Sequence, residues 1–279
     1  MDKLYNSVAF KISRLITREY SNSFSKAVSY LENDGSQAIY SIYGFVRYAD
    51  EIVDTFQAID KDKILDSFES EYYIAAARGV STNPVLHSFL LTVKKYRIDD
   101  TLIKAFLKSM RSDLSKTQYS SKKEMDEYVY GSADVVGLMC LKVFVIGDEA
   151  LYERLKAPAM RLGSAFQKVN FLRDLKSDTQ VLNRQYFPEL TGGILTDEIK
   201  EKIIPQITAD FMASYEGIHW LPGRSKLAVS LAFYYYMALL KKIQKKPAEK
   251  IMESRISLSR MKKFALLVKA YTAYVLNLI

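Results

Sequence analysis

The segment Gln167-Lys-Val-Asn-Phe-Leu-Arg-Asp-Leu-Lys-Ser-Asp178 carries the pattern that decides the fold. Four oxygen-bearing side chains recur in it at spacings of three, four and four residues: Gln167, Asn170, Asp174 and Asp178. On an α-helix this spacing stacks them along one face. The side chains between them, and the preceding residues 157–166, are largely apolar. We therefore expect one buried helix whose polar stripe faces an interior cleft instead of bulk water.

A second segment, Asp50-Glu-Ile-Val-Asp54, repeats the acidic part of this pattern. Each segment places two aspartates one helical turn apart, and each pair has an arginine nearby, Arg47 or Arg173. Carboxylates one turn apart repel each other, so each pair needs either solvent or a cation. Two such helices facing each other would place four carboxylates around one cleft.

Carboxylates and arginines together suggest a particular ligand. Mg²⁺ prefers oxygen ligands and is commonly shared between protein carboxylates and substrate phosphates, and arginine binds phosphate oxygens. A single acidic pair is common on solvated helix faces and is weak evidence for a metal. The repetition of the pair with its arginine favours a site for several Mg²⁺ ions and a diphosphate.

Composition and periodicity predict a single all-α domain covering residues 1–279. The chain is 49% hydrophobic, and its 11 glycines and 6 prolines are too few to punctuate the short strands of an all-β fold. Long segments with helical periodicity follow one another without βαβ alternation or a linker. The apolar segment 125–146 contains Gly131 and Gly137, which indicates that a neighbour approaches the helix closely there.

Charge and cysteine content limit the partners and the location. The net charge of +8 comes from dispersed residues without a one-sided basic stripe, so we expect no nucleic-acid partner. Cys140 is the only cysteine, which rules out an intramolecular disulfide and is compatible with a reducing cytosol. The apolar run Phe264–Ile279 is interrupted by Lys269, which favours packing or peripheral membrane contact over spanning. We expect a cytoplasmic protein, with peripheral contact at the inner face of the membrane left open.

Both acidic segments resemble motifs of one family, the squalene/phytoene synthases. Tyr43–Asp54 is similar to the family's first aspartate-rich motif and Gln167–Asp178 to its second. Further similarities extend the resemblance over residues 21–188: Ser21–Phe24, Met110–Leu114, Tyr128–Gly137 and Arg184–Pro188. The C-terminal third is looser, and only Arg255–Arg260 is similar to a basic motif there. Among the family's members the sequence most resembles bacterial phytoene synthases.

The resemblance implies an isoprenoid-synthase-type helical bundle with a central cleft. It also implies roles for individual residues. The Mg²⁺ ligands would be Asp50, Asp54, Asn170, Asp174 and Asp178, with Glu51 assisting. The residues that hold the diphosphate groups would be Ser21, Ser23, Arg47, Gln167, Arg173 and Tyr186, with Arg255 as a further contact.

The reaction that the resemblance implies is Mg²⁺-dependent head-to-head condensation of two geranylgeranyl diphosphates. It passes through a cyclopropylcarbinyl diphosphate and ends in phytoene. Water would quench the allylic cations involved, so the cavity must be dry and lined by side chains that tolerate positive charge. The aromatic candidates for this lining are Tyr130, which we also expect to be catalytic, Tyr43, Phe24 and Phe45. Among the consecutive aromatic residues 233–236, at least one must face inward.

Two alternatives remain open from the sequence. Squalene or dehydrosqualene synthesis from farnesyl diphosphate would need a shorter tunnel, and a sequence does not display tunnel length. A non-catalytic relative that acts as an assembly factor would have eroded aspartate motifs. The intact pairs Asp50/Asp54 and Asp174/Asp178 argue against the second alternative. The sequence leaves the oligomeric state undetermined.

Overall fold

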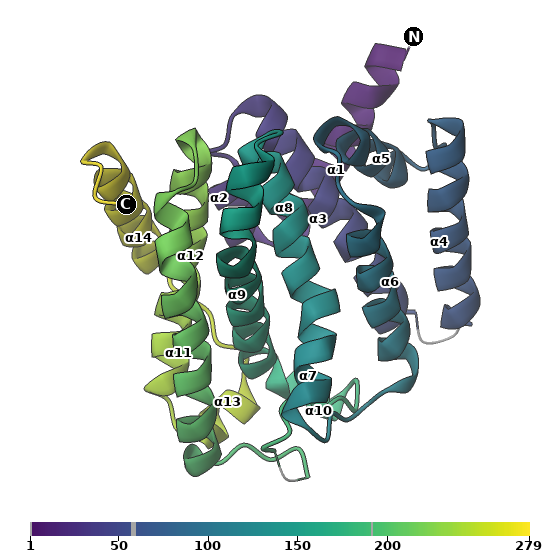
Figure 1. Ribbon diagram of the computed structural model, residues 1–279. Coiled ribbons are helices and arrows are strands. Elements are labelled where there is room, and N and C mark those ends of the chain that lie inside the picture. The colour runs from purple at the N-terminus through teal and green to yellow at the C-terminus, as the bar shows by residue number, and fades with distance from the viewer. Residues whose placement is uncertain (1, 57–59, 191) are drawn as a thin grey trace.

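Long helices lie side by side in a bundle in the computed structural model, which describes residues 2–56, 60–190 and 192–279 (Figure 1). Within those ranges the only β pairing is an isolated bridge between Gln118 and Gln185, so the prediction of an all-α fold is confirmed. The elements are α1 (Asp2–Tyr20), α2 (Asn22–Val28), α3 (Asn33–Asp54), α4 (Lys61–Arg78), α5 (Pro84–Tyr96), α6 (Asp100–Ser115), α7 (Lys122–Val129), the π-helical segment η1 (Tyr130–Asp134), α8 (Val135–Val145), α9 (Glu149–Arg173), α10 (Leu175–Gln180), α11 (Asp197–His219), α12 (Gly223–Gln244), α13 (Ala248–Glu253) and α14 (Arg260–Val275).

Local sequence sets several of these boundaries. Asn83 caps the start of α5, where its side chain accepts hydrogen bonds from the backbone N–H groups of Val85 and Leu86, and Pro84 occupies the first helical position. At the end of α4, Gly79 has a φ of +80°, a left-handed conformation that glycine adopts without steric cost. These local signals explain why α4 ends and α5 begins at these residues.

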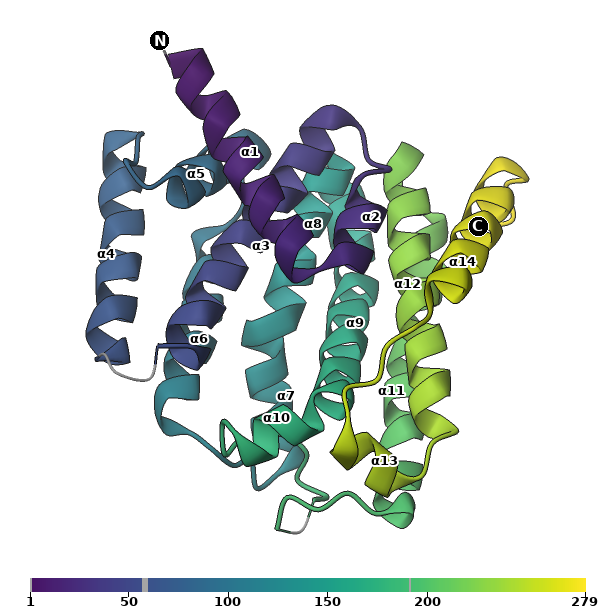
Figure 2. The ribbon, with the colours of Figure 1, turned by 180° about the vertical axis from the view of Figure 1, so that it is seen from behind.

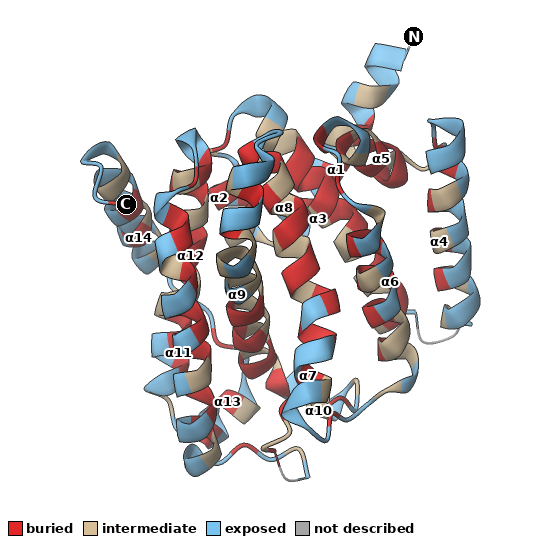
Figure 3. Cartoon of the chain, in the orientation of Figure 1, coloured by how far each residue is buried: buried red, intermediate tan, exposed pale blue. Residues whose placement is uncertain are grey.

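The core follows the inward faces of the helices, where buried residues gather (Figure 3). One cluster of buried side chains is built mainly from α3 to α6 and α8, and a second from α7 to α12. Phe45 of α3 is fully buried and stacks on Phe89 at a ring-centroid distance of 4.0 Å. Phe45 is therefore a core residue and does not line the cavity, contrary to our expectation from the sequence.

The predicted apolar helix over 125–146 forms as three consecutive pieces, α7, η1 and α8. A Cβ atom on Gly131 would lie 2.7 Å from the carbonyl oxygen of Ala105, and one on Gly137 would lie 3.0 Å from that of Ala159. The predicted close approach is thus confirmed at both glycines. The segment Lys122–Val145 has the length and hydropathy of a membrane span, but 61% of its most apolar window is buried inside the bundle. It is a core element of this fold.

The bundle brings the two acidic segments into one region. α3 contains Asp50 and Asp54 near its C-terminal end, and the junction of α9 and α10 contains Asp174 and Asp178. The short helices α10 and α13 lie close together at the same end of the bundle (Figure 2). α14 packs against α12 at the outer edge of the molecule (Figure 2).

Candidate active site

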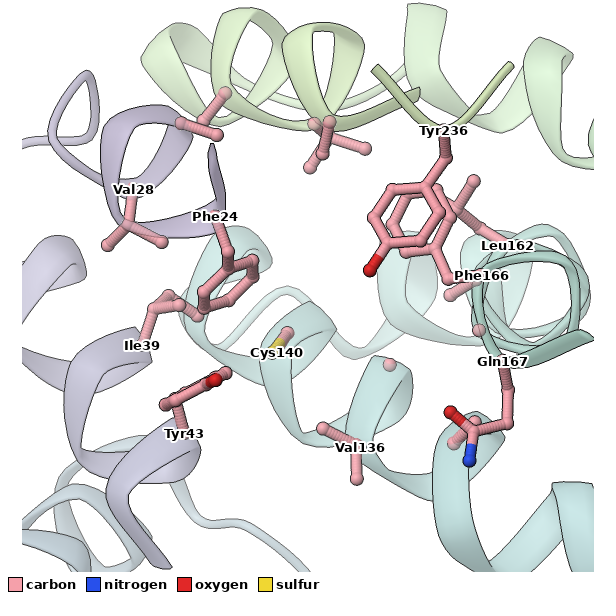
Figure 4. A pocket seen from close by; sticks show the side chains of 18 of the residues that line it. Phe24, Val28, Ile39, Tyr43, Val136, Cys140, Leu162, Phe166, Gln167 and Tyr236 are labelled. Atoms are coloured by element: carbon pink, nitrogen blue, oxygen red, sulfur yellow. The ribbon is translucent and has the colours of Figure 1, made fainter. Parts of the chain in front are cut away.

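A mostly apolar cavity of about 410 Å³ lies among α2, α3, η1, α8, α9, α11 and α12. Phe24 and Tyr43 lie on one side of it and Phe166 and Tyr236 on the other, while Val136 and Cys140 of α8 lie between them (Figure 4). Phe24 stacks on Tyr43 at 5.1 Å, and Phe166 stacks on Tyr236 at 4.1 Å between ring centroids. Two aromatic pairs therefore face each other across an apolar space.

Polar residues gather in one part of the cavity wall. Six of the residues expected from the sequence to contact substrate line the cavity: Ser21, Tyr43, Arg47, Gln167, Arg173 and Arg255. Asn170, a predicted metal ligand, lines it as well. Its Oδ1 accepts a hydrogen bond of 3.2 Å from the Tyr236 hydroxyl. The cavity thus combines an apolar interior with three arginines, and it confirms that one of the aromatic residues 233–236 faces inward.

Arginine holds the carboxylates of α3. Arg47 donates to Asp50 at 2.5 Å and also to Glu51, and its guanidinium lies 4.2 Å from the ring centroid of Tyr20. Burial, together with repulsion from Asp54, raises the pKa of Asp50 to about 7. Asp50 therefore holds its proton more tightly than an exposed aspartate does, and a cation nearby would favour its ionised form.

Arg184 is a member of the site to which the sequence assigned no role. Its side chain is buried and donates to Asp54 at 2.6 Å and to the backbone carbonyl of Asp113 at 3.0 Å. Asp113 is buried too, accepts a 2.8 Å hydrogen bond from the Tyr128 hydroxyl, and has its pKa raised to about 7 by burial. Arg184 and Asp113 both fall in segments that resemble the family, which was the available signal for their importance.

The second acidic segment is two helices and not the single helix that its spacing predicts. α9 ends at Arg173, and Asp174 has φ −101° and ψ 9°, outside the helical region, before α10 begins at Leu175. The bend directs the Asp174 carboxylate toward two arginines: it accepts from Arg173 at 3.0 Å and from Arg255 at 2.7 Å. The prediction of one continuous stripe of four polar side chains is therefore wrong, because the helix is interrupted at Asp174, the third of the four residues.

Asp178 shows that the two acidic segments influence each other. Burial first, and then repulsion from Asp174 and Asp54, raises the pKa of Asp178 to about 8. Arg184 joins the two segments, since its backbone N–H donates to the Asp178 carbonyl at 2.7 Å and its guanidinium donates to Asp54 of α3 at 2.6 Å. This connection supports the predicted facing of the two acidic segments, whereas none of their four aspartates is part of the cavity lining.

These residues fit a divalent cation by their chemistry. Across the described ranges no three acidic, histidine or cysteine side chains converge into a preformed metal site. Asp50, Asp54 and Asp174 are each paired with arginine instead. The raised pKa values of Asp50 and Asp178 reflect buried carboxylates that lack sufficient positive charge. A divalent cation that entered together with a diphosphate would supply this charge and would leave the arginines free to bind phosphate oxygens.

Seven predicted site residues are not part of the cavity lining: the four aspartates Asp50, Asp54, Asp174 and Asp178, and also Ser23, Tyr130 and Tyr186. The π-helical turn that begins at Tyr130 leaves its side chain 41% exposed and presents Ser132 and Ala133 to the cavity instead. Tyr186 is buried in an aromatic cluster, where it stacks on Phe171 at 4.0 Å between ring centroids. Ser23 is half-buried on α2, whereas its neighbour Ser21 caps that helix and lines the cavity.

This chain is similar to known proteins over most of its length. The family model for squalene/phytoene synthases matches residues 17–191. Phytoene synthase 3, chloroplastic, of Zea mays is 30% identical over 275 residues, which cover 92% of this chain and 64% of that protein. Phytoene synthase 1, chloroplastic, of the same plant is 32% identical over 196 residues, which cover 66% of this chain and 45% of that protein. This chain thus spans about half to two thirds of the length of these relatives.

Solved structures share the fold over nearly the whole chain. A dehydrosqualene synthase in complex with a ligand aligns with a TM-score of 0.84 and 21% identity, covering 97% of this chain and 98% of that one. A squalene synthase from Alicyclobacillus acidocaldarius aligns with a TM-score of 0.74 and 23% identity, covering 87% and 95%. The fold is that of the all-α isoprenoid synthases, as predicted. With the family model matching more than half of its length, the chain belongs to the squalene/phytoene synthase family.

Proposed function

We propose that this protein condenses two prenyl diphosphates head to head, and that its substrate is geranylgeranyl diphosphate and its product phytoene. The observation that carries the proposal is a cavity in which an apolar, aromatic-lined interior meets Arg47, Arg173 and Arg255, each of which pairs with an aspartate of the two acidic segments. Such a cavity matches a molecule with a long hydrocarbon chain and a doubly charged head.

The polar end of the cavity would hold the diphosphate groups. Arg47, Arg173 and Arg255 already interact with carboxylates there, and guanidinium groups can bind phosphate oxygens in the same way. Gln167 and Ser21 would add neutral hydrogen bonds. Exchange of a carboxylate for a phosphate at each arginine would couple substrate binding to release of the aspartates.

The released carboxylates, with the Asn170 amide oxygen, would hold Mg²⁺. A bound Mg²⁺ ion would neutralise negative charge on the diphosphate leaving group. Asp50, Asp54, Asp174 and Asp178 would hold it in their ionised forms, which requires Asp50 and Asp178 to lose the protons that burial favours. Metal binding at this site would therefore release protons and strengthen as the pH rises.

The interior of the cavity suits allylic cations. Tyr43, Phe166 and Tyr236 line the cavity, and the ring quadrupole of an aromatic side chain attracts a cation without supplying a nucleophile. Burial raises the pKa of Tyr43 to about 12 and that of Cys140 to about 12, so both remain neutral at physiological pH. The surrounding aliphatic side chains exclude water that would otherwise quench the cation.

The choice of geranylgeranyl over farnesyl diphosphate is supported by the curated relatives. Relatives that are 30–32% identical are named phytoene synthases. The solved squalene and dehydrosqualene synthases are 21–23% identical and inform on the fold only. The sequence relatives therefore favour the longer substrate.

Product identification tests the proposal. The protein would be incubated with Mg²⁺ and either farnesyl or geranylgeranyl diphosphate, with and without NADPH, and the hydrocarbons would be separated by chromatography and identified by mass. We expect phytoene from geranylgeranyl diphosphate without NADPH. Squalene or dehydrosqualene from farnesyl diphosphate would correct the substrate, and no hydrocarbon from either would refute the enzymatic function.

The variant Asp174→Asn tests the predicted metal site. Removal of its charge weakens metal binding and loosens Arg173 and Arg255, so we expect turnover to fall by about 100-fold or more and the Mg²⁺ requirement to rise. Asp66→Asn is the matched control, because Asp66 lies on α4 with its side chain 62% exposed. Unchanged turnover and Mg²⁺ dependence in Asp174→Asn would remove this residue from the metal site.

A further inference from the structure

A buried hydrogen bond lies directly behind the cavity wall, and the proposed condensation gives it no role. Asp134 of η1 accepts a 2.7 Å hydrogen bond from the Ser164 hydroxyl of α9, and both residues are buried. Neither residue is part of the cavity lining. Their neighbours in the chain are: Ala133 precedes Asp134, Gly163 precedes Ser164, and both line the cavity. The hydrogen bond therefore joins two elements of the wall from behind.

The backbones of η1 and α9 approach each other closely at this point. A Cβ atom on Gly163 would lie 2.8 Å from the carbonyl oxygen of Ala133 and 3.1 Å from the Cα atom of Asp134. π-helical turns are rare and occur mostly as single turns inside longer helices, often at functional sites. The side chains of Asp134 and Ser164 are thus placed to hold η1 in this uncommon conformation against α9.

Charged side chains from three elements surround Asp134. Lys168 of α9 pairs with Asp210 of α11 at 2.8 Å and lies 3.9 Å from Asp126 of α7, and both Lys168 and Asp210 are buried. Burial raises the pKa of Asp134 to about 7, although the positive charge of Lys168 opposes this shift. The surroundings of Asp134 therefore accommodate an uncharged carboxyl group, and an amide of the same shape should fit there too.

We propose that Asp134 is a positioning residue, which accepts a hydrogen bond from Ser164 and thereby holds the cavity wall of Ala133 and Gly163 against the reacting prenyl chains. This inference rests on the proposed function, whose reaction passes through cations that water would capture. Capture forms a C–O bond and releases a proton, and it yields a prenyl alcohol beside the diphosphate that has already left. A wall that moves would admit water, so loss of the hydrogen bond should change the products more than substrate binding.

The ratio of products in the purified full chain tests the proposal. The parent protein and its variants would be incubated with Mg²⁺ and the prenyl diphosphate that the parent converts, and hydrocarbons and alcohols would be quantified by chromatography and mass. In Asp134→Ala and Ser164→Ala we expect the alcohol fraction to rise at least about fivefold and kcat for hydrocarbon to fall about tenfold, with KM within about twofold of the parent. Asp134→Asn keeps an acceptor for Ser164 and should restore the product ratio of the parent.

Ser88→Ala is the matched control. Ser88 is buried, and its hydroxyl oxygen lies 2.8 Å from that of Ser13, so this variant also removes a buried hydroxyl between two helices. Neither serine lines the cavity. Ser88→Ala should lower the midpoint of urea unfolding as Ser164→Ala does, and it should leave the product ratio unchanged. An equal alcohol fraction in the two variants would overturn the proposal, because the effect would then follow from lower stability alone.

Hydrogen exchange without substrate gives a second measurement. We expect the backbone amides of residues 130–137 to exchange at least about fivefold faster in Ser164→Ala than in the parent, and at the parent's rate in Ser88→Ala. Unchanged exchange of this segment in Ser164→Ala would overturn the proposal even if turnover fell. A parent protein that makes no hydrocarbon would refute the proposed function instead, and the exchange rates would still decide whether Asp134 and Ser164 hold η1.

Discussion

At the scale of single residues, Arg184 organises the first acidic segment. It is the buried partner of Asp54 and also holds the backbone around Asp113, so it connects α3 to the end of α6. Despite the opposing effect of burial, the carboxylates of Asp113 and Asp54 raise the pKa of Arg184, and the guanidinium stays charged. Loss of a buried ion-pair partner leaves an uncompensated charge behind, which is strongly destabilising.

The variant Arg184→Gln should therefore lower the free energy of unfolding by about 3 kcal/mol, measured by urea denaturation at pH 7 without Mg²⁺. Arg111→Gln is the control, since Arg111 pairs with Asp66 and Glu69 while its side chain is 42% exposed, and it should cost less than about 1 kcal/mol. Adding Asp54→Asn to Arg184→Gln should restore part of the loss. Equal losses for the two arginine variants would show that burial of the Arg184 pair has no energetic weight.

At the scale of elements, two departures from regular helix shape the site. α9 ends at Arg173, so Asp174 and Asp178 do not continue this helix. The Asp174 carboxylate instead accepts a hydrogen bond from Arg255. The π-helical segment η1 shifts the register between α7 and α8, so that Ser132 and Ala133 line the cavity and Tyr130 does not. A regular helix would direct these side chains elsewhere: Asp174 away from Arg255, and Ser132 and Ala133 away from the cavity.

The close packing of η1 on α6 predicts the effect of Gly131→Ala. A Cβ atom there would overlap the Ser109 hydroxyl and lie 2.7 Å from the Ala105 carbonyl oxygen, which is backbone and cannot rotate away. We expect a loss of about 1–3 kcal/mol in the free energy of unfolding, measured by denaturant titration. Gly35→Ala in α3 is the control, because its nearest contact would be at 3.9 Å, and it should stabilise by up to about 1 kcal/mol. A stabilising Gly131→Ala would mean that η1 can move away from α6.

At the scale of the whole molecule, the facing of α3 and α10 produces a pH-dependent stability. Burial, and then repulsion from Asp54 and, for Asp178, from Asp174, raises the pKa of Asp50 to about 7 and that of Asp178 to about 8 in the folded protein, against 3.8 for an unperturbed aspartate. The folded carboxyls hold their protons more tightly than the unfolded ones do. The stability from these two groups is therefore fully present below about pH 4 and is lost as the pH rises through about 7 to 8.

Thermal unfolding in EDTA at a series of pH values between 5.5 and 8.5 measures this dependence. We expect the midpoint to fall as the pH rises, and the fall to be smaller in Asp178→Asn by at least about 1 kcal/mol in unfolding free energy over the range. Mg²⁺ should raise the midpoint more at pH 8 than at pH 6, since it competes with protons for the same carboxyls. A Mg²⁺ effect that is independent of pH, or an unchanged slope in Asp178→Asn, would contradict this account.

The sequence by itself determined the fold class and named seven site residues that line the cavity. Helical periodicity predicted the long helices because this signal, like the caps at Asn83 and Gly79, acts within a few residues of the chain. The repeated acidic pairs identified Asp50–Asp54 and Asp174–Asp178 without any contact information. Local spacing and local capping chemistry are sufficient for predictions of this kind.

Only the tertiary structure decided how these residues are used. The helix ends before Asp174, and Tyr130 lies outside the cavity. Tyr186 and Phe45 are buried in the core. Arg184 pairs with Asp54, which lies 130 residues away in the sequence. Each of these outcomes depends on which element packs against which, a long-range contact that no periodicity within one helix contains.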